Sequence, residues 1–211
     1  MTEQPGAKKV SARTLSRLPQ YLQYLEALHA DGIGYVTSAQ LAQALGCSDA
    51  LTRKDVAALG HTGRAGRGYS VEALRHTIAH ILGVTSGRRV LLVGAGNLGT
   101  ALMSYEGFGD RGMHITAVAD SDPEKIGQTI GGYTILDIHD IGTDHDMELA
   151  IVAVPGNVAQ DVADQLVDAG ITGILNFAPR RLQVPDHVIV QTVDLSAELQ
   201  ILAFHRKGIS G

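Results

Sequence analysis

The stretch GAGNLG at residues 94–99 follows the apolar run 90–93 and opens a helical pattern that reaches about Tyr105. In a strand–turn–helix with the pattern G-x-G-x-x-G, the first glycine permits a tight turn, the second lets the backbone approach a pyrophosphate, and the third lets helix and strand pack closely. Exposed N–H groups at the start of the helix favour the anion. The sequence therefore predicts a dinucleotide site on six residues, which are Gly94, Ala95, Gly96, Asn97, Leu98 and Gly99.

Asp120 lies 21 residues after Gly99, at the end of a second apolar run, 115–119. A carboxylate at this position accepts hydrogen bonds from the adenosine ribose hydroxyls, and its charge would repel a 2′-phosphate. No arginine follows it closely, since Ser121, Asp122 and Pro123 come next. The pattern therefore favours NAD(H) over NADP(H). The alternative is that Asp120 only caps the turn that follows it.

Three further apolar runs, 148–154, 174–177 and 188–193, alternate with helical patterns. Continuous apolar strands that alternate with helices predict an α/β fold with a parallel sheet covered on both faces. Ligands of such sheets bind outside the carboxyl ends of the strands. The strand ends therefore predict contacts to the nicotinamide half, although prolines also end strands for steric reasons alone and Phe177 could be core. These candidates are Val154, Pro155, Asn176 and Phe177.

Residues 11–82 contain four amphipathic helical patterns separated by glycines. Pro19 lies inside the first, so that helix either kinks or begins there. A tight turn at Gly46 joins the second and third, and two short helices joined in this way form a helix-turn-helix. The glycine-rich stretch 60–69 is predicted to be a small hairpin, or wing. The four patterns cover about residues 11–31, 38–45, 49–59 and 70–82.

The third of these helical patterns has one face of small and cationic residues. Arg53 and Lys54 lie on it, and such a face can enter a major groove, where Arg53 could read a guanine or grip a phosphate. Asp55 falls on the inward side and so requires an internal cationic or N–H partner. A solvated helix face and an ordinary loop are the alternative. The candidate DNA-binding residues are Ser48, Thr52, Arg53, Lys54, Arg64, Arg67 and Gly68.

Composition excludes several other classes. The 211 residues are 45% hydrophobic and 18% charged, without an apolar run long enough for a transmembrane helix. The single cysteine, Cys47, forms no intrachain disulfide, and a polar first decapeptide is no secretory signal, so a cytoplasmic location is expected. Residues 1–70 carry eight basic and five acidic side chains, against nine and seventeen in the remainder. This asymmetry indicates a basic module joined to an acidic one. The alternative is that the charges are distributed by chance.

Seven sequence blocks extend over both halves of the chain. They are SRLPQYLQYL from Ser16, TRKDVAALGHTGRAGRGY from Thr52, VGAGNLGTAL from Val93, YEGFG from Tyr105, DSDPEKIG from Asp120, GILNFAPRRLQVP from Gly173 and VDLSAELQ from Val193. In their order and spacing these blocks resemble the Rex family of redox-sensing transcriptional repressors, and the resemblance extends from about Ser11 to Phe204.

The resemblance implies a homodimer with three parts: a winged helix-turn-helix domain (1–83), a Rossmann-like NAD(H)-binding domain (84–194) and a C-terminal helix (195–211) exchanged into the partner subunit. It implies that NADH closes the dimer and releases it from a palindromic operator, whereas NAD+ competes without causing release. The recognition helix would carry Arg53 and Lys54.

In the family pattern, Tyr105, Asn176 and Phe177 would lie near the nicotinamide. Asp194 would lie at the subunit interface and pair with Tyr105 in one ligand state. Two positions depart from this pattern. Gln23 stands where an arginine that pairs with the carboxylate is common, so the interface switch could be weaker here. Ala58-Leu59 replaces an aromatic pair, which predicts looser packing beside the wing.

Two other functions compete with a repressor. An NAD-dependent dehydrogenase needs a substrate domain and a general acid or base. Only about 15 residues follow the last predicted strand, and the histidines are scattered along the chain. A coenzyme A-binding domain could share the same sheet. However, Asp120 suits an unmodified ribose better than the phosphorylated ribose of coenzyme A.

Overall fold

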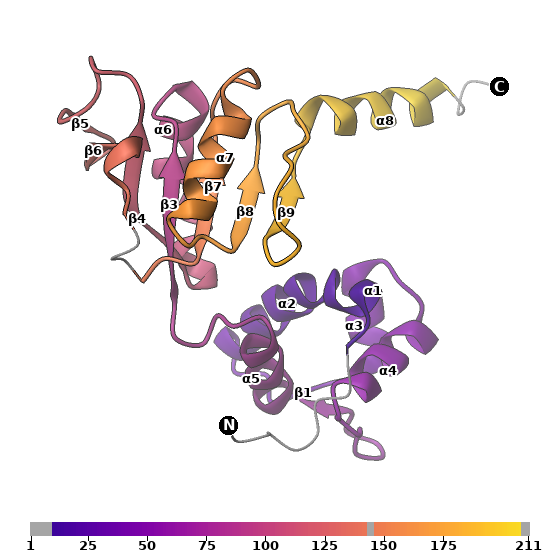
Figure 1. Ribbon diagram of the computed structural model, residues 1–211. Helices are drawn as coiled ribbons and strands as arrows, with labels where there is room; N and C mark the ends of the chain where they lie inside the picture. Colours follow the sequence, from indigo (N-terminus) through magenta and orange to yellow (C-terminus); the bar gives the residue numbers. More distant parts are fainter. Residues whose placement is uncertain (1–9, 143–145, 208–211) are drawn as a thin grey trace. The chain divides into compact units, whose positions relative to one another are not determined.

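The computed structural model describes residues 10–142 and 146–207, with side chains described up to residue 204. The chain divides into two compact units, Met1–Ser86 and Gly87–Gly211 (Figure 1). The N-terminal unit has one apolar core, beneath its helices. The C-terminal unit has two, on opposite faces of its sheet.

In its described residues, 10–86, the N-terminal unit has five helices and a two-stranded ribbon. Pro19 occupies the first turn of its second helix, which begins at Leu18, so the proline starts this helix and does not kink it. The elements are α1 (Ala12–Leu15), α2 (Leu18–Ala30), β1 (Tyr35–Val36), α3 (Ser38–Leu45), α4 (Asp49–Ala58), β2 (Tyr69–Ser70) and α5 (Val71–Ile81).

Local capping sets the turn between α3 and α4. Thr37 and Gln40 form a reciprocal capping box at the start of α3, and Gly46 ends that helix in the left-handed conformation at φ 64°. Ser48 then caps α4 through a hydrogen bond from the Leu51 N–H. These caps produce the predicted helix-turn-helix.

The predicted wing is a short hairpin. Within the predicted stretch 60–69 an antiparallel bridge joins Arg64 to Gly68, and β2, which follows, pairs antiparallel with the distant β1. Gly68 has a φ of +85°, and a Cβ there would lie 2.3 Å from the carbonyl oxygen of Val36. Only glycine lets the hairpin approach β1 this closely.

The C-terminal unit is a seven-stranded sheet in the order β5-β6-β4-β3-β7-β8-β9, with every neighbouring pair parallel except β5–β6. Its strands are β3 (Arg88–Val93), β4 (Met113–Asp120), β5 (Thr129–Ile130), β6 (Tyr133–Asp137), β7 (Leu149–Val152), β8 (Gly173–Asn176) and β9 (Ile189–Thr192). Its helices are α6 (Asn97–Met103), η1 (Gly109–Arg111), η2 (Ile138–Asp140), α7 (Ala159–Asp168) and α8 (Leu195–Lys207).

Strands β5 and β6 were not predicted from the sequence. They lie at the edge of the sheet, where only one residue of β6, Ile135, is buried. An edge strand of this kind lacks the continuous apolar run by which the central strands were recognised.

Helices lie on both faces of the sheet, as predicted, but they cover one of the two faces only in part. Helix α7 packs on the face that carries Leu91 and Val93, and α6 packs on the face that carries Val90 and Leu92. The connection from β8 to β9 contains no helix. Strands β7, β8 and β9 therefore have no covering helix from their own unit on the α6 face.

Candidate functional site

The glycine-rich turn has the geometry that its sequence predicts. Gly94 has a φ of +104°, and a Cβ there would lie 2.5 Å from the carbonyl oxygen of Ala153; a Cβ on Gly99 would lie 1.7 Å from the oxygen of Gly94. Gly96 differs, because nothing lies within 4 Å of a Cβ at that position. The first and third glycines thus serve packing, and the second borders open space in front of α6.

Asp120 faces this turn from the end of β4. One carboxylate oxygen, Oδ2, accepts the backbone N–H of Ala95 at 2.8 Å and Lys125 Nζ at 3.1 Å, and Oδ1 accepts the N–H of Asp122 at 3.0 Å. Asp120 therefore also caps the turn after β4, as the alternative interpretation held. Burial opposes ionisation, but the hydrogen bonds from Ala95, Asp122 and Lys125 outweigh it and lower the pKa of this carboxyl.

Lys125 was not singled out from the sequence. Its ammonium lies 3.1 Å from Asp120 and 3.4 Å from Asp122, and the two carboxylates raise the pKa of the lysine. The only sequence feature that could have identified Lys125 as part of the site was its position in the block DSDPEKIG, five residues after Asp120.

A cavity of about 700 Å³ opens at the carboxyl ends of β8 and β9. Leu98, from the glycine-rich turn, lines it together with Phe177 and Asp194. Asp194 also caps α8, because its Oδ1 accepts the N–H groups of Ser196 and Ala197. Three residues from separate sequence blocks are thus brought together in one cavity.

Asn176 is placed differently from the prediction, because its side chain is fully buried. Its amide donates to the carbonyl oxygens of Ala178 and Arg180, at 3.3 and 2.9 Å, and its Oδ1 accepts the N–H of Ala178. In this structure the Asn176 amide is therefore engaged by the loop beside the cavity. After the end of β7, Val154 is half-buried and lies beside Gly94, whereas Pro155 is exposed.

Tyr105 does not meet Asp194 within the chain. Its ring is about half exposed, packs edge-on against Phe108 at 5.0 Å, and lines a different cavity together with Met103 and Tyr133. Any contact between Tyr105 and Asp194 therefore requires a second subunit or a change of conformation.

The α4 surface presents two of the predicted DNA contacts. Arg53 and Lys54 are exposed, and Ser48 stands at the N-terminus of the helix. Thr52 is a correction, because its side chain is fully buried and its hydroxyl lies 3.4 Å from the hydroxyl of Tyr21 and 3.2 Å from Cys47 Sγ. From that position Thr52 packs α4 onto the core and does not reach DNA.

Asp55 has the internal partner that its position required. Arg17 Nε and Nη2 donate to its two oxygens at 2.7 and 2.6 Å, and Thr14 and Tyr21 add hydroxyl contacts at 3.0 and 3.3 Å. Burial raises the pKa of Tyr21 to about 12, so its phenol remains a donor. This cluster ties α1 and α2 to α4.

The two wing arginines, Arg64 and Arg67, both contact the side chain of Tyr35. Arg67 lies over the ring of Tyr35 at 5.1 Å, and Arg64 Nη1 donates to the Tyr35 hydroxyl at 3.3 Å. Both guanidinium groups are exposed, as predicted for contacts to a nucleic acid backbone or minor groove. Gln23 is exposed on α2.

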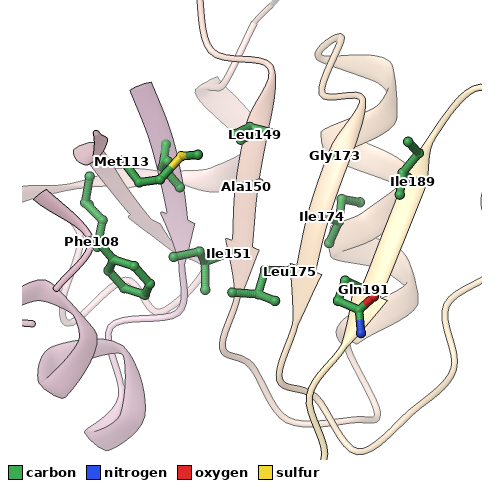
Figure 2. A pocket seen from close by; sticks show the side chains of 12 residues that line it. Phe108, Met113, Leu149, Ala150, Ile151, Gly173, Ile174, Leu175, Ile189 and Gln191 are labelled. Atoms are coloured by element: carbon green, nitrogen blue, oxygen red, sulfur yellow. The ribbon is translucent and has the colours of Figure 1, made fainter. Parts of the chain in front are cut away.

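An apolar groove of about 260 Å³ runs across the uncovered part of the sheet (Figure 2). Leu149, Leu175 and Ile189 project into it from β7, β8 and β9, and Phe108 and Met113 close one end. The same unit leaves α8 extended beyond the sheet (Figure 1). Its exposed apolar side chains are Leu195, Leu199, Ile201, Leu202 and Phe204.

In the part of the chain that the structure describes, no helix is long and apolar enough to span a membrane. Among the same residues, no three His, Cys, Asp or Glu side chains gather as a metal site would require.

Comparison with known proteins gives matches in both units. A family profile described as "CoA binding domain" matches residues 85–180, and one described as "Putative DNA-binding protein N-terminus" matches residues 9–56. The redox-sensing transcriptional repressor Rex of Carboxydothermus hydrogenoformans is 47% identical over 201 residues, which cover 93% of this chain and 96% of that protein. Rex of Streptomyces coelicolor is 43% identical over 208 residues, covering 97% and 81%.

Solved structures agree with this result. The crystal structure of RSP in complex with β-NAD+ and operator DNA has a TM-score of 0.88 at 33% identity and covers 95% of this chain and 94% of that one. RSP in complex with β-NADH has a TM-score of 0.82 at 32% identity, covering 96% and 97%.

Proposed function

Because this chain belongs to the Rex family of redox-sensing transcriptional repressors, we propose that its C-terminal unit binds NADH and NAD+ and that NADH releases its N-terminal unit from operator DNA. The family is one of repressors and not of enzymes. We expect the chain to act in the cytoplasm, as a homodimer on a palindromic operator.

The observation that carries the cofactor assignment is the ionised Asp120, held beside the glycine-rich turn by Ala95 and Lys125. A carboxylate at the end of the second central strand accepts the two hydroxyls of an adenosine ribose. The open space at Gly96 leaves room for the pyrophosphate. The same carboxylate would repel the ribose phosphate of coenzyme A, so a nicotinamide dinucleotide fits this coenzyme A-type sheet better.

Asp120→Ser is expected to weaken NADH binding about tenfold, because the ribose hydroxyls lose a charged acceptor. It should also strengthen NADPH binding, because the repulsion disappears and Lys125 becomes available to a 2′-phosphate. Adding Lys125→Met to Asp120→Ser should remove that gain. The measurement is a fluorescence titration of each variant with both cofactors. Equal NADPH affinity in the single and double variants would contradict the role given to Lys125.

We propose that the apolar groove receives α8 of a second subunit. Exposed patches of this kind on a monomer mark interaction surfaces. The groove is lined by apolar side chains of the sheet, and Leu195, Leu199 and Leu202 of α8 are each more than half exposed. Closure of such a dimer by NADH would change the spacing of the two recognition helices, which must match one helical turn of DNA. NADH can shift the dimer only by its differential affinity for the closed state.

Leu199→Glu with Leu202→Glu is expected to convert the dimer to a monomer, because two charges would have to enter an apolar interface. NADH affinity should change less than about threefold, while operator affinity should fall because one half-site is lost. Analytical ultracentrifugation and a gel shift measure the two effects. Gln200→Glu, at a polar position of the same helix, is the control. A double variant that stays dimeric would refute this use of α8.

The test of the function is a gel-shift titration of the purified chain on a palindromic operator selected from random duplexes, at fixed salt. NADH should release the DNA, whereas NAD+ should not. By linkage, operator DNA should weaken NADH binding by the same factor. Release by NADH would also show that Gln23 supports the switch. A chain that binds NADH and no DNA would overturn the proposal.

A further inference from the structure

Arg53, on the exposed side of α4, is held by two side chains of its own unit. Its Nε donates to Ser38 Oγ at 3.2 Å, and its Nη2 forms an ion pair with Asp49 Oδ2. Ser38 is the first residue of α3 and Asp49 is the first residue of α4. The guanidinium therefore joins the N-terminal ends of both helices of the helix-turn-helix, and its side chain remains 65% exposed.

The two contacts occupy one edge of the guanidinium. Nε and Nη2 form the side edge, whereas Nη1 and the second N–H of Nη2 form the end edge. Neither Ser38 nor Asp49 contacts Nη1. Two parallel N–H groups at the end of an arginine are the donors that a guanine accepts at O6 and N7 in the major groove.

The direction of the side chain agrees with this role. Helical side chains lean back toward the N-terminus of their helix. The contact with Asp49, four residues earlier, confirms that lean for Arg53. The N-terminal residues of a recognition helix are those that contact base edges. A fixed guanidinium of this kind suits contact with a base edge, whereas a phosphate contact would require no such constraint.

We propose that Asp49 and Ser38 are positioning residues that orient Arg53 to read a guanine of the operator. The inference rests on the proposed function. An acidic side chain on a DNA-facing turn repels phosphates and so lowers the sequence-independent part of the affinity. Asp49 is therefore expected to raise discrimination between bases at the expense of nonspecific affinity.

The experiment is selection of binding sites from a randomised duplex pool by the full-length chain with NAD+ present. Wild type is compared with Arg53→Ala, Arg53→Lys, Asp49→Ala and Ser38→Ala, and Arg13→Ala is the control at an exposed cation of α1 in the same unit. Wild type should prefer guanine at one position of each half-site. Asp49→Ala should reduce that preference by on the order of tenfold. It should also leave affinity for random DNA equal or higher.

The other variants sharpen the result. Arg53→Ala should lose the guanine preference at the same base pair. Arg53→Lys should also lose it but keep the salt dependence of DNA affinity, because lysine retains the charge without the two parallel N–H donors of the guanidinium. Ser38→Ala should reduce the guanine preference less than Asp49→Ala does. The double variant Arg53→Ala with Asp49→Ala should be no worse than Arg53→Ala alone. Arg13→Ala should leave the guanine preference in place.

Three outcomes would overturn the inference. Asp49→Ala could keep the full preference and change only the melting temperature, which is the result expected if Asp49 merely stabilises the α4 dipole. Arg53→Ala could weaken all sequences equally, which would make Arg53 a phosphate contact. Finally, if wild type enriched no sequence at all, the proposed repressor function would fail and this inference with it.

Discussion

Gly96→Val is expected to reduce NADH affinity by at least about hundredfold while the chain remains as stable as wild type. A Cβ at Gly96 meets nothing within 4 Å, and the backbone φ there is −81°, so a β-carbon at this position adds no internal clash or backbone strain. The isopropyl group would instead fill the space expected for the pyrophosphate. Hydrogen bonds to a charged group contribute about 1.5–3 kcal/mol each, and the loss of two exceeds a hundredfold in affinity.

Calorimetric titration with NADH and a thermal unfolding curve measure the two quantities. Gly99→Ala is the matched comparison, because its Cβ would lie 1.7 Å from the oxygen of Gly94. Overpacking of this kind costs about 1–3 kcal/mol or more, so this variant should lose stability as well as affinity. Normal NADH binding by Gly96→Val would show that the pyrophosphate does not approach this turn.

Asp55→Ala is expected to lower the free energy of unfolding of the N-terminal unit by about 3–5 kcal/mol. The carboxylate is buried and accepts hydrogen bonds from Thr14, Arg17 and Tyr21. Its removal leaves a partly buried guanidinium and two hydroxyls without their acceptor. Operator affinity should fall as well, because the cluster fixes α4 against α1 and α2.

Urea unfolding followed by helical circular dichroism measures this loss. Glu72→Ala is the control, since Glu72 pairs with Arg75 on the surface of the same unit, where an ion pair contributes at most about 1 kcal/mol. If the two variants were equally stable, the cluster would have no structural role.

The same cluster predicts a dependence of stability on pH. Burial of Asp55 opposes ionisation, but hydrogen bonds from Arg17, Thr14 and Tyr21 outweigh it and lower the pKa of Asp55 below its ordinary value of 3.8. A carboxyl with a lowered pKa in the folded state stabilises the fold fully above its unfolded value. The contribution of Asp55 should therefore be lost as the pH falls below about 3.8, and Asp55→Ala should flatten the decline.

Local patterns in the sequence were sufficient for the features that depend on a few neighbouring residues. The turn at Gly46 and the glycine-rich turn at 94–99 each depend on backbone angles and hydrogen bonds within a few positions. The inward position of Asp55 also followed from helical periodicity alone.

Features that depend on distant residues could not be obtained in this way. Arg17 lies 38 positions from Asp55, and no local pattern identifies it as the partner. Thr52 and Asn176 were assigned to DNA and cofactor from their positions in motifs, yet neighbouring elements bury both side chains. Lys125 joined the cofactor site only because its turn folds back onto β4.

The uncovered groove also depends on residues that are distant in the sequence. The apolar strands predicted a parallel sheet, and no helix was predicted between 177 and 188, but the sequence did not show which part of the sheet this leaves uncovered. Sequence periodicity reports which side of an element is apolar. It does not report what covers that side, because burial is a property of surfaces that meet only after the chain has folded. The N-terminal and C-terminal units were therefore evident from sequence, whereas the neighbours of each functional side chain required the tertiary structure.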